Sequence, residues 1–431
     1  MTLRLDDARM MASAVPSGVG PQEWNELAVR FGDVHAAFAK AHAAGRIGFT
    51  ELDAQAAEFA RASAFAEGRR RATDVVVLGI GGSALGVIAL RTALAAPGAD
   101  PRLHVVDNVD PLTFAGLLAD LPLTTTQWVV VSKSGATVET LAQYAIVRER
   151  LAGAGLDAAA HLTFVTDPAE GALRAIATRD GIACFDVPPN VGGRFSALTP
   201  VGTVPALLAG YDAAAFVAGA RAMRDRCATP SLQDNPAGQF AALHWRAHQR
   251  AGQGTHVMMA YSDGLRDIAP WFVQLWAESL GKTDADGIPV GPTPVAARGA
   301  TDQHSLLQLL MEGPADKVVS FVRVATHPHD LTIPAVHLPS ALAFAGGHTL
   351  GALLDAEADA TARALVSAGR PSLTLTVDAA DAHAIGELMM LLMIATVYAG
   401  TFYRVNPFGQ PGVELGKRLA RETLAARNAS S

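Results

Sequence analysis

Short apolar runs that alternate with helical patterns limit most strongly how this chain can fold. The first run starts at Asp74 (DVVVLGI), ends in a Gly/Ser turn and is followed by a helical pattern. Further runs begin at Leu103, Gln127, His161 and Gly181. Strands that are apolar throughout and are separated by helices are typical of a parallel sheet covered on both faces. The sequence therefore predicts an α/β fold that begins with such a sheet.

The same alternation resumes after Pro230. A helical pattern over residues 236–250 precedes a run at Thr255, and further runs start at Lys317 and Ser372. A chain of 431 residues is also too long for one ordinary core. We therefore expect a second parallel-sheet unit and an α/β fold of two doubly wound domains with flanking helices.

The change from one unit to the next lies between Leu208 and Asn235, where a helix is expected to cross the join. The predicted segments are a helical one over 1–70, a first sheet domain over 71–220, a second over 221–402 and a helical end over 403–431. The longest apolar run, Leu388–Tyr403, is shorter than the ~20 residues of a bilayer span, so it is interpreted as a buried helix.

The net charge and the cysteines of the chain indicate which partners and which cellular compartment are expected. The formal net charge is −7 and there is no basic stripe, so nucleic acid is not an expected partner. No membrane segment is predicted. The two cysteines, Cys184 and Cys227, form no CxxC motif, which favours a reducing, cytoplasmic location without disulfides.

The turn Gly79–Gly86 (GIGGSALG) joins the first strand to a helix. Glycines let a backbone approach a ligand closely, and the helix N-terminus presents free N–H groups to an anion. Gly79, Gly81 and Ala84 also match the dinucleotide fingerprint, with Asp107 placed for a ribose. A nicotinamide dehydrogenase is therefore one alternative, and a turn needed only for packing is another.

A second turn, Ser132–Thr140 (SKSGATVET), follows the apolar strand that starts at Gln127. The hydroxyls of Ser132, Ser134, Thr137 and Thr140, together with turn N–H groups, can surround a phosphate monoester. A dinucleotide site does not need this second turn. Ordinary helix capping explains one or two such hydroxyls but not all of them.

Arg194 follows two glycines in the loop NVGGRFS. Such a loop can bring a guanidinium to a ligand, where its permanent charge stabilises developing negative charge. Taken alone, this segment fits a surface arginine equally well.

Glu278 lies on a helical pattern whose apolar face is formed by Trp271, Phe272, Leu275 and Trp276. Glu278 is at the edge of that face, and Gln274 precedes it by one turn. Partial desolvation raises the pKa of a carboxylate and suits it to proton abstraction. A solvated helix glutamate is the alternative.

Two further polar residues are expected near helix starts. Thr301 or Asp302 is expected to cap a helix with His304 in its first turn, where a neutral histidine can shuttle protons. Near the C-terminus, Glu414 and Arg418 are expected to pair on the outside of a helix. Lys417 then either snorkels or faces a site.

Six segments together resemble the phosphoglucose isomerase family, in the family's order: GIGGSALG, SKSGATVET, VGGRFS, QLWAESLGK, TDQHS and QPGVELGK. The resemblance runs from about residue 74 to the C-terminus. It implies a compact bacterial-type member with two sugar isomerase (SIS) domains of flavodoxin-like fold.

The resemblance also implies roles. Glu278 resembles the base that moves a proton between C1 and C2, and Arg194 the group that stabilises the enediolate. His304 and Lys417 resemble the pair that opens the sugar ring. The implied substrate-binding residues are Gly82, Ser83, Ser132, Lys133, Ser134, Thr137, Thr140, Gly193, Gln274 and Gln410.

The implied activity is aldose–ketose isomerisation of glucose 6-phosphate and fructose 6-phosphate, with no cofactor and no metal. A homodimer with shared active sites is implied, because the family's motif histidine reaches across to its neighbour. Ala84 and the pair Gly135–Ala136 depart from some longer relatives, which leaves substrate preference open. A bifunctional enzyme that also accepts mannose 6-phosphate and a non-catalytic phosphosugar sensor remain alternatives.

Overall fold

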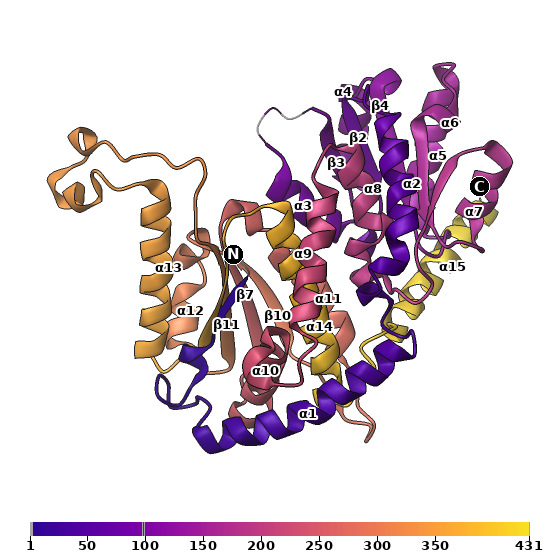
Figure 1. Ribbon diagram of the computed structural model, residues 1–431. Helices are drawn as coiled ribbons and strands as arrows, with labels where there is room; N and C mark the ends of the chain where they lie inside the picture. Colours follow the sequence, from indigo (N-terminus) through magenta and orange to yellow (C-terminus); the bar gives the residue numbers. More distant parts are fainter. Residues whose placement is uncertain (1–2, 97, 99, 431) are drawn as a thin grey trace.

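The first sheet is built from strands that are close together in the sequence. The computed structural model describes residues 3–96, 98 and 100–430. The sheet has the order β3-β2-β4-β5-β6 and is parallel throughout. Figure 1 labels β2, β3 and β4 of this sheet. Its strands are β2 (Asp74–Leu78), β3 (Arg102–Val106), β4 (Thr126–Val131), β5 (Leu162–Thr166) and β6 (Ala183–Asp186).

Both faces of this sheet are covered, as the apolar runs predict. Val75 and Val77 of β2 belong to one buried cluster, whereas Val76 and Leu78 belong to another on the opposite face. The covering helices are α2 (Ala56–Glu67), α3 (Leu85–Leu94), α4 (Pro111–Asp120), α5 (Val138–Gly153), α6 (Ala158–His161), α7 (Ala172–Asp180) and α8 (Pro200–Leu208).

The second sheet has the order β1-β12-β11-β7-β10. Its parallel strands are β7 (Thr255–Tyr261), β10 (Thr293–Arg298), β11 (Lys317–Val324) and β12 (Ser372–Val377), and β1 (Arg4–Asp6) adds an antiparallel edge. A short hairpin pairs β8 (Lys282–Thr283) with β9 (Pro289–Val290). The helices of this half are α10 (Pro236–Ala251), α11 (Ile268–Leu280), α12 (Leu307–Glu312), α13 (Leu350–Ser367) and α14 (Ala382–Phe402).

The parallel strands of the two sheets follow the same path. In each half the parallel strands are counted in chain order. The second strand (β3 or β10) lies on one side of the first (β2 or β7), and the third and fourth (β4 and β5, or β11 and β12) lie on the other side of the first. This is the flavodoxin-like order, in which ligands bind where the strand order reverses. The reversal falls between β2 and β4 in the first sheet and between β7 and β11 in the second.

Two edge strands were not predicted from the sequence. The stretch over 1–70 was expected to be helical. It contains α1 (Pro21–Ala43) and α2, but Arg4–Asp6 pairs with β12. The second missed strand is β10, on the other edge of that sheet. The domain boundaries near 70, 220 and 402 stay a prediction.

The apolar run near the C-terminus is the buried helix α14. By length and composition alone it could cross a membrane, but 94% of its apolar window is buried. It packs on α9 (Ala213–Arg226) so closely that a Cβ atom at Gly219 would lie 1.9 Å from the His383 carbonyl oxygen. Figure 1 shows α9, α11 and α14 gathered between the two sheets. Both cysteines are unpaired.

Candidate functional site

The two predicted anion-binding turns lie side by side at the reversal point of the first sheet. The turn Gly81–Ser83 follows β2 and leads into α3, and the turn that starts at Ser132 follows β4 and leads into α5. Because β2 and β4 are parallel neighbours, both turns open at the same edge. The hydroxyl of Ser83 makes no hydrogen bond within the described chain.

The turn after β4 gathers hydroxyls around the start of α5. The Ser132 and Thr137 hydroxyls are 2.8 Å apart, and the Ser134 hydroxyl accepts the N–H of Ala136 at 3.3 Å. The hydroxyl of Thr140 is buried without a partner among the described residues. Thr137 precedes the helix, but its side chain caps no N–H group. Helix capping therefore does not explain the turn, whereas an anion would satisfy the free N–H groups of the first turn.

Lys133 holds this turn against a neighbouring loop. Its Nζ donates to the carbonyl oxygens of Pro189 and Val191, each at 2.8 Å, which leaves one of its three N–H groups. Burial lowers the pKa of Lys133, and nearby Asp167 opposes that shift. The lysine therefore connects the turn after β4, the predicted phosphate-binding turn, to the segment that carries Arg194.

The turn after β2 touches the same segment. A Cβ atom at Gly82 would lie 2.3 Å from the carbonyl carbon of Gly193, so no larger residue fits there without movement. The Ser196 hydroxyl donates to the Gly193 carbonyl at 2.6 Å and lies 3.4 Å from the Gly82 carbonyl. Three loops therefore meet at Gly193 and Arg194.

Arg194 is buried, with 4% of its surface exposed, so the interpretation as a surface arginine is wrong. All five of its N–H groups are used. They reach Ser279 Oγ (2.7 Å), Glu278 Oε2 (3.1 Å), Gln410 Oε1 (3.1 Å) and the carbonyls of Pro407 and Gly409. Burial lowers the pKa of Arg194, and Glu278 counteracts this.

Glu278 occupies the position that the helical pattern predicts. The residues of the predicted apolar face are all buried in α11, whereas the Glu278 side chain is 32% exposed. Its carboxylate accepts from Gln274 Nε2 and from Arg194 Nη1, both at 3.1 Å. Gln274 Nε2 also faces Gly81, where a Cβ atom would lie 3.0 Å away. A helix of the second half thus presents its carboxylate to the turns of the first.

Lys282 is a neighbour of Arg194 that was not predicted as part of the site. Its Nζ donates to the carbonyls of Asn406 and Phe408, beside the two carbonyls that Arg194 holds. Burial, with Arg194 nearby, lowers the pKa of Lys282 to about 8, while Glu278 opposes the shift. The two cations fix the loop over 406–410 and thereby position Gln410. Lys282 is the last residue of the QLWAESLGK segment, and its place in that segment is the only feature of the sequence that could have pointed to it.

His304 and Lys417 are not brought to this site within one chain. Both are exposed, and no hydrogen bond or ion pair among the described residues links either to Glu278 or Arg194. His304 ends a short turn, Thr301–His304, and α12 begins only at Leu307. The expected helix cap is therefore wrong: the Asp302 carboxylate accepts the N–H of Arg298 at 2.7 Å instead.

Lys417 lies on α15 (Glu414–Ser430), whose described side chains are exposed. Its Nζ donates to Glu414 at 2.8 Å. The predicted Glu414–Arg418 pair is wrong, because Arg418 faces Glu422 at 3.8 Å.

Two turns of the predicted anion-binding type at the reversal point of a parallel sheet, a fully bonded guanidinium and an adjacent carboxylate are the features expected of an α/β enzyme that acts on a small anionic substrate. Residues 57–431 match the family model described as Phosphoglucose isomerase. This chain belongs to the phosphoglucose isomerase family. The dinucleotide interpretation of the first turn is therefore wrong.

Several named proteins are similar to this chain over most of its length. A glucose-6-phosphate isomerase of Rubrobacter xylanophilus is 46% identical over 362 residues, covering 81% of this chain and 82% of that one. A probable glucose-6-phosphate isomerase of Natronomonas pharaonis is 40% identical and covers 98% and 95%. The solved glucose-6-phosphate isomerase of Chlamydia trachomatis is 27% identical, with a TM-score of 0.77 over 86% of this chain and 73% of that one.

Proposed function

We propose that this chain interconverts glucose 6-phosphate and fructose 6-phosphate through an enediol(ate), as an aldose–ketose isomerase of glycolysis and gluconeogenesis. The two substrates are inferred from the names of its relatives, which are glucose-6-phosphate isomerases. The observation that carries the chemistry is the Glu278 carboxylate, which is held by Arg194 beside two anion-binding turns.

The phosphate group is assigned to the turn after β4. Its hydroxyls and the N–H groups at the start of α5 lack enough protein partners, and Thr140 has a buried hydroxyl with none among the described residues. Lys133 supports this turn from behind and retains one N–H for the anion. Gly82 and Ser83 form the facing wall, and Gln274 and Gln410 flank the sugar.

Glu278 acts as the base on the open-chain sugar. It takes the proton from C2 of the aldose, the electrons of the C2–H bond form the C1=C2 double bond, and the C1 carbonyl oxygen takes the negative charge of the enediolate. A proton then passes from O2 to O1, the C2–O2 group becomes the ketose carbonyl, and the protonated carboxyl gives its proton to C1 as the C1=C2 double bond is lost. Arg194 stabilises the oxyanion. Because all five of its N–H groups are engaged, either Gln410 or Glu278 must release Nη1 as that charge develops.

Ring opening is assigned to His304 and Lys417, and His304 is assigned to the partner subunit's site in a homodimer. His304 is exposed in the single chain, as a shared site requires. The segment between β11 and α13 projects from the body (Figure 1). It exposes the large apolar side chains of Leu331, Val336, Leu342 and Phe344, which a second subunit could cover. The role of Lys417 rests on the resemblance of its segment, QPGVELGK, to the family.

A mixing experiment tests the shared site. His304→Ala and Glu278→Gln proteins, each inactive alone, are combined under conditions of subunit exchange. Half of the sites in a mixed dimer then contain both intact residues, so part of the activity should return. Mixed dimers that form and remain inactive would rule out sharing.

A coupled assay tests the function itself. The purified protein, dialysed against EDTA, should convert fructose 6-phosphate to glucose 6-phosphate without added metal or nucleotide. Mannose 6-phosphate in the same assay distinguishes a bifunctional enzyme. Binding of phosphosugar without conversion would indicate the non-catalytic sensor instead. A cytoplasmic location is also proposed, supported by the unpaired Cys184 and Cys227.

A further inference from the structure

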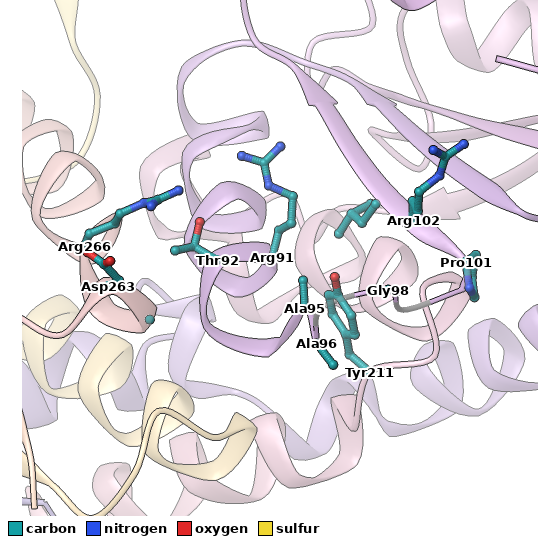
Figure 2. Close-up of a pocket in the computed structure, with 12 residues that line it drawn as sticks. Arg91, Thr92, Ala95, Ala96, Gly98, Pro101, Arg102, Tyr211, Asp263 and Arg266 are labelled. Atoms are coloured by element: carbon teal, nitrogen blue, oxygen red, sulfur yellow. The ribbon is translucent and has the colours of Figure 1, made fainter. Parts of the chain in front are cut away.

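The loop after β7 corresponds by strand order to the substrate turn after β2. It consists of Asp263–Leu265 and Arg266 and leads into α11. No residue of the proposed active site lies in it. Together with the end of α3 and the start of β3, it lines a cavity of about 500 Å³ (Figure 2). Open α/β sheets bind ligands at such loops, and the volume suits a small molecule.

More guanidinium groups than carboxylates line the cavity, although the protein as a whole is acidic. Its lining includes the guanidinium groups of Arg91, Arg102 and Arg266 and one carboxylate, that of Asp263. The Asp263 side chain is 79% exposed and lies 3.9 Å from Arg298 Nη1. Local guanidinium groups, unlike the net charge of −7, favour an anion at this place.

The three arginines differ in how many of their guanidinium N–H groups already bond to the protein. Arg102 donates to the buried carboxylate of Asp74 at 2.9 and 3.1 Å. Among the described residues, the side chain of Arg266 has only a 3.7 Å approach to Asp267. The side chain of Arg91 makes no hydrogen bond or ion pair with any described residue. Arg91 and Arg266 therefore have donors available for a ligand.

Arg91 and Arg266, whose donors are available, line the same cavity. Figure 2 shows the guanidinium groups of Arg91 and Arg266 on either side of Thr92, with Tyr211 on another wall. The Thr92 hydroxyl is used by Asp267, to which it donates at 2.5 Å. Burial raises the pKa of Tyr211, against the effect of Arg91, so the phenol keeps its proton and can donate.

We propose that this cavity binds a phosphate-bearing small molecule, with the phosphate between Arg91 and Arg266 and the remainder against Tyr211 and Leu103. The site is separate from the proposed active site. It lies where α3 ends and β3 begins, whereas the substrate turns lie where β2 and β4 end. It therefore goes beyond the proposed isomerase function.

Calorimetric titration with pyrophosphate tests this site in the full chain. Saturating fructose 6-phosphate occupies the active site, so one pyrophosphate site should remain. The Arg91→Gln variant removes a guanidinium group that makes no hydrogen bond or ion pair with the described residues, so the fold should be unaffected. It should weaken this binding by about tenfold or more, as expected for loss of a charge-assisted hydrogen bond, and Arg91→Gln/Arg266→Gln should abolish it.

The matched control is Arg46→Gln/Arg71→Gln, which removes two exposed arginines elsewhere and changes the net charge equally. It should bind pyrophosphate within about twofold of the wild type, since such charges act only at long range. Equal binding by the Arg91→Gln/Arg266→Gln and control proteins would overturn the proposal, as would the absence of any site under saturating substrate. If fructose 6-phosphate does not bind, the proposed function fails, yet the double variant should still lose a pyrophosphate site.

Discussion

The two sheets of this protein share one strand order but contribute differently to the site. After β4, the third strand in the first half, the chain reads Ser132-Lys133-Ser134-Gly135. After β11, its counterpart, it reads Ala325-Thr326-His327-Pro328. The first sheet supplies turns rich in hydroxyls and glycine, and the second half supplies the helix with Glu278. The common path of the strands sets where loops lie, and the loop residues decide what they bind.

The largest effect is expected at the carboxylate from the second half. Glu278→Gln keeps the shape and one of the two hydrogen bonds that the carboxylate accepts but removes the basic oxygen, so kcat should fall by about 10²–10⁴ with little change in KM. Steady-state kinetics measure this, with Glu312→Gln as the exposed control. If more than about a tenth of kcat remains, the loss falls short of the ~10² expected for a general base, and another residue is the base.

Arg194→Lys should come next. Lysine keeps the charge but cannot hold five acceptors, so kcat should fall by about 10²–10³, the cost of losing a preorganised oxyanion donor. The control on the second sheet is Arg323→Lys. Arg323 also bridges two carboxylates, those of Asp355 and Asp359, but lies outside the site. Equal kcat losses in both variants would mean that Arg194 acts only through stability.

The phosphate turn gives a direct contrast between the two sheets. Thr137→Val should raise KM by roughly ten- to hundredfold, because it removes a hydroxyl assigned to the phosphate. Thr326→Val, after β11, removes a hydroxyl that donates only to the Asp378 carbonyl, so KM should not change. An unchanged KM in Thr137→Val would mean that the phosphate does not bind at this turn of the first sheet.

The second half also contains buried histidines that should make folding sensitive to acid. Burial lowers the pKa of His244 to about 4, and it lowers that of His256 well below the usual range. An unfolded histidine titrates near 6.5, so below about pH 6.5 the unfolded state binds protons that the folded state excludes. The free energy of unfolding should therefore fall as pH drops from 6.5 towards 4, by about 1.4 kcal/mol per pH unit for each histidine.

Urea unfolding at several pH values measures that slope. His244→Gln should reduce it by the share of one histidine, whatever its effect on stability at neutral pH. His329→Gln, at an exposed position, should leave the slope unchanged. A wild-type slope that is flat below pH 6.5 would contradict the burial argument.

The parallel core was predictable because its signal is local. Buried strands such as Asp74–Leu78 are apolar throughout, and the helix with Glu278 has a clear apolar face. The missed strands lack such a signal. β10 is only partly buried and contains Pro294, and β1 has three residues whose pairing depends on β12.

The site was predictable as a set of turns but not as a network of contacts. Arg194 connects α11 with the loop over 406–410, and Lys133 reaches carbonyls more than fifty positions away. Such contacts depend on how the two halves pack. For this reason Lys282 was missed, and Lys133 was assigned to the substrate although two of its N–H groups support a loop.

The isotope at C2 of the sugar tests most directly whether Glu278 moves the proton. Glucose 6-phosphate labelled with deuterium at C2 is incubated with each protein in water, and the label is followed by NMR. The wild type should release deuterium to the solvent during isomerisation. Glu278→Gln should retain the label while the anomers still interconvert, because His304 and Lys417 are intact. Release of the label by Glu278→Gln at the wild-type rate would contradict the assignment of this carboxylate as the base.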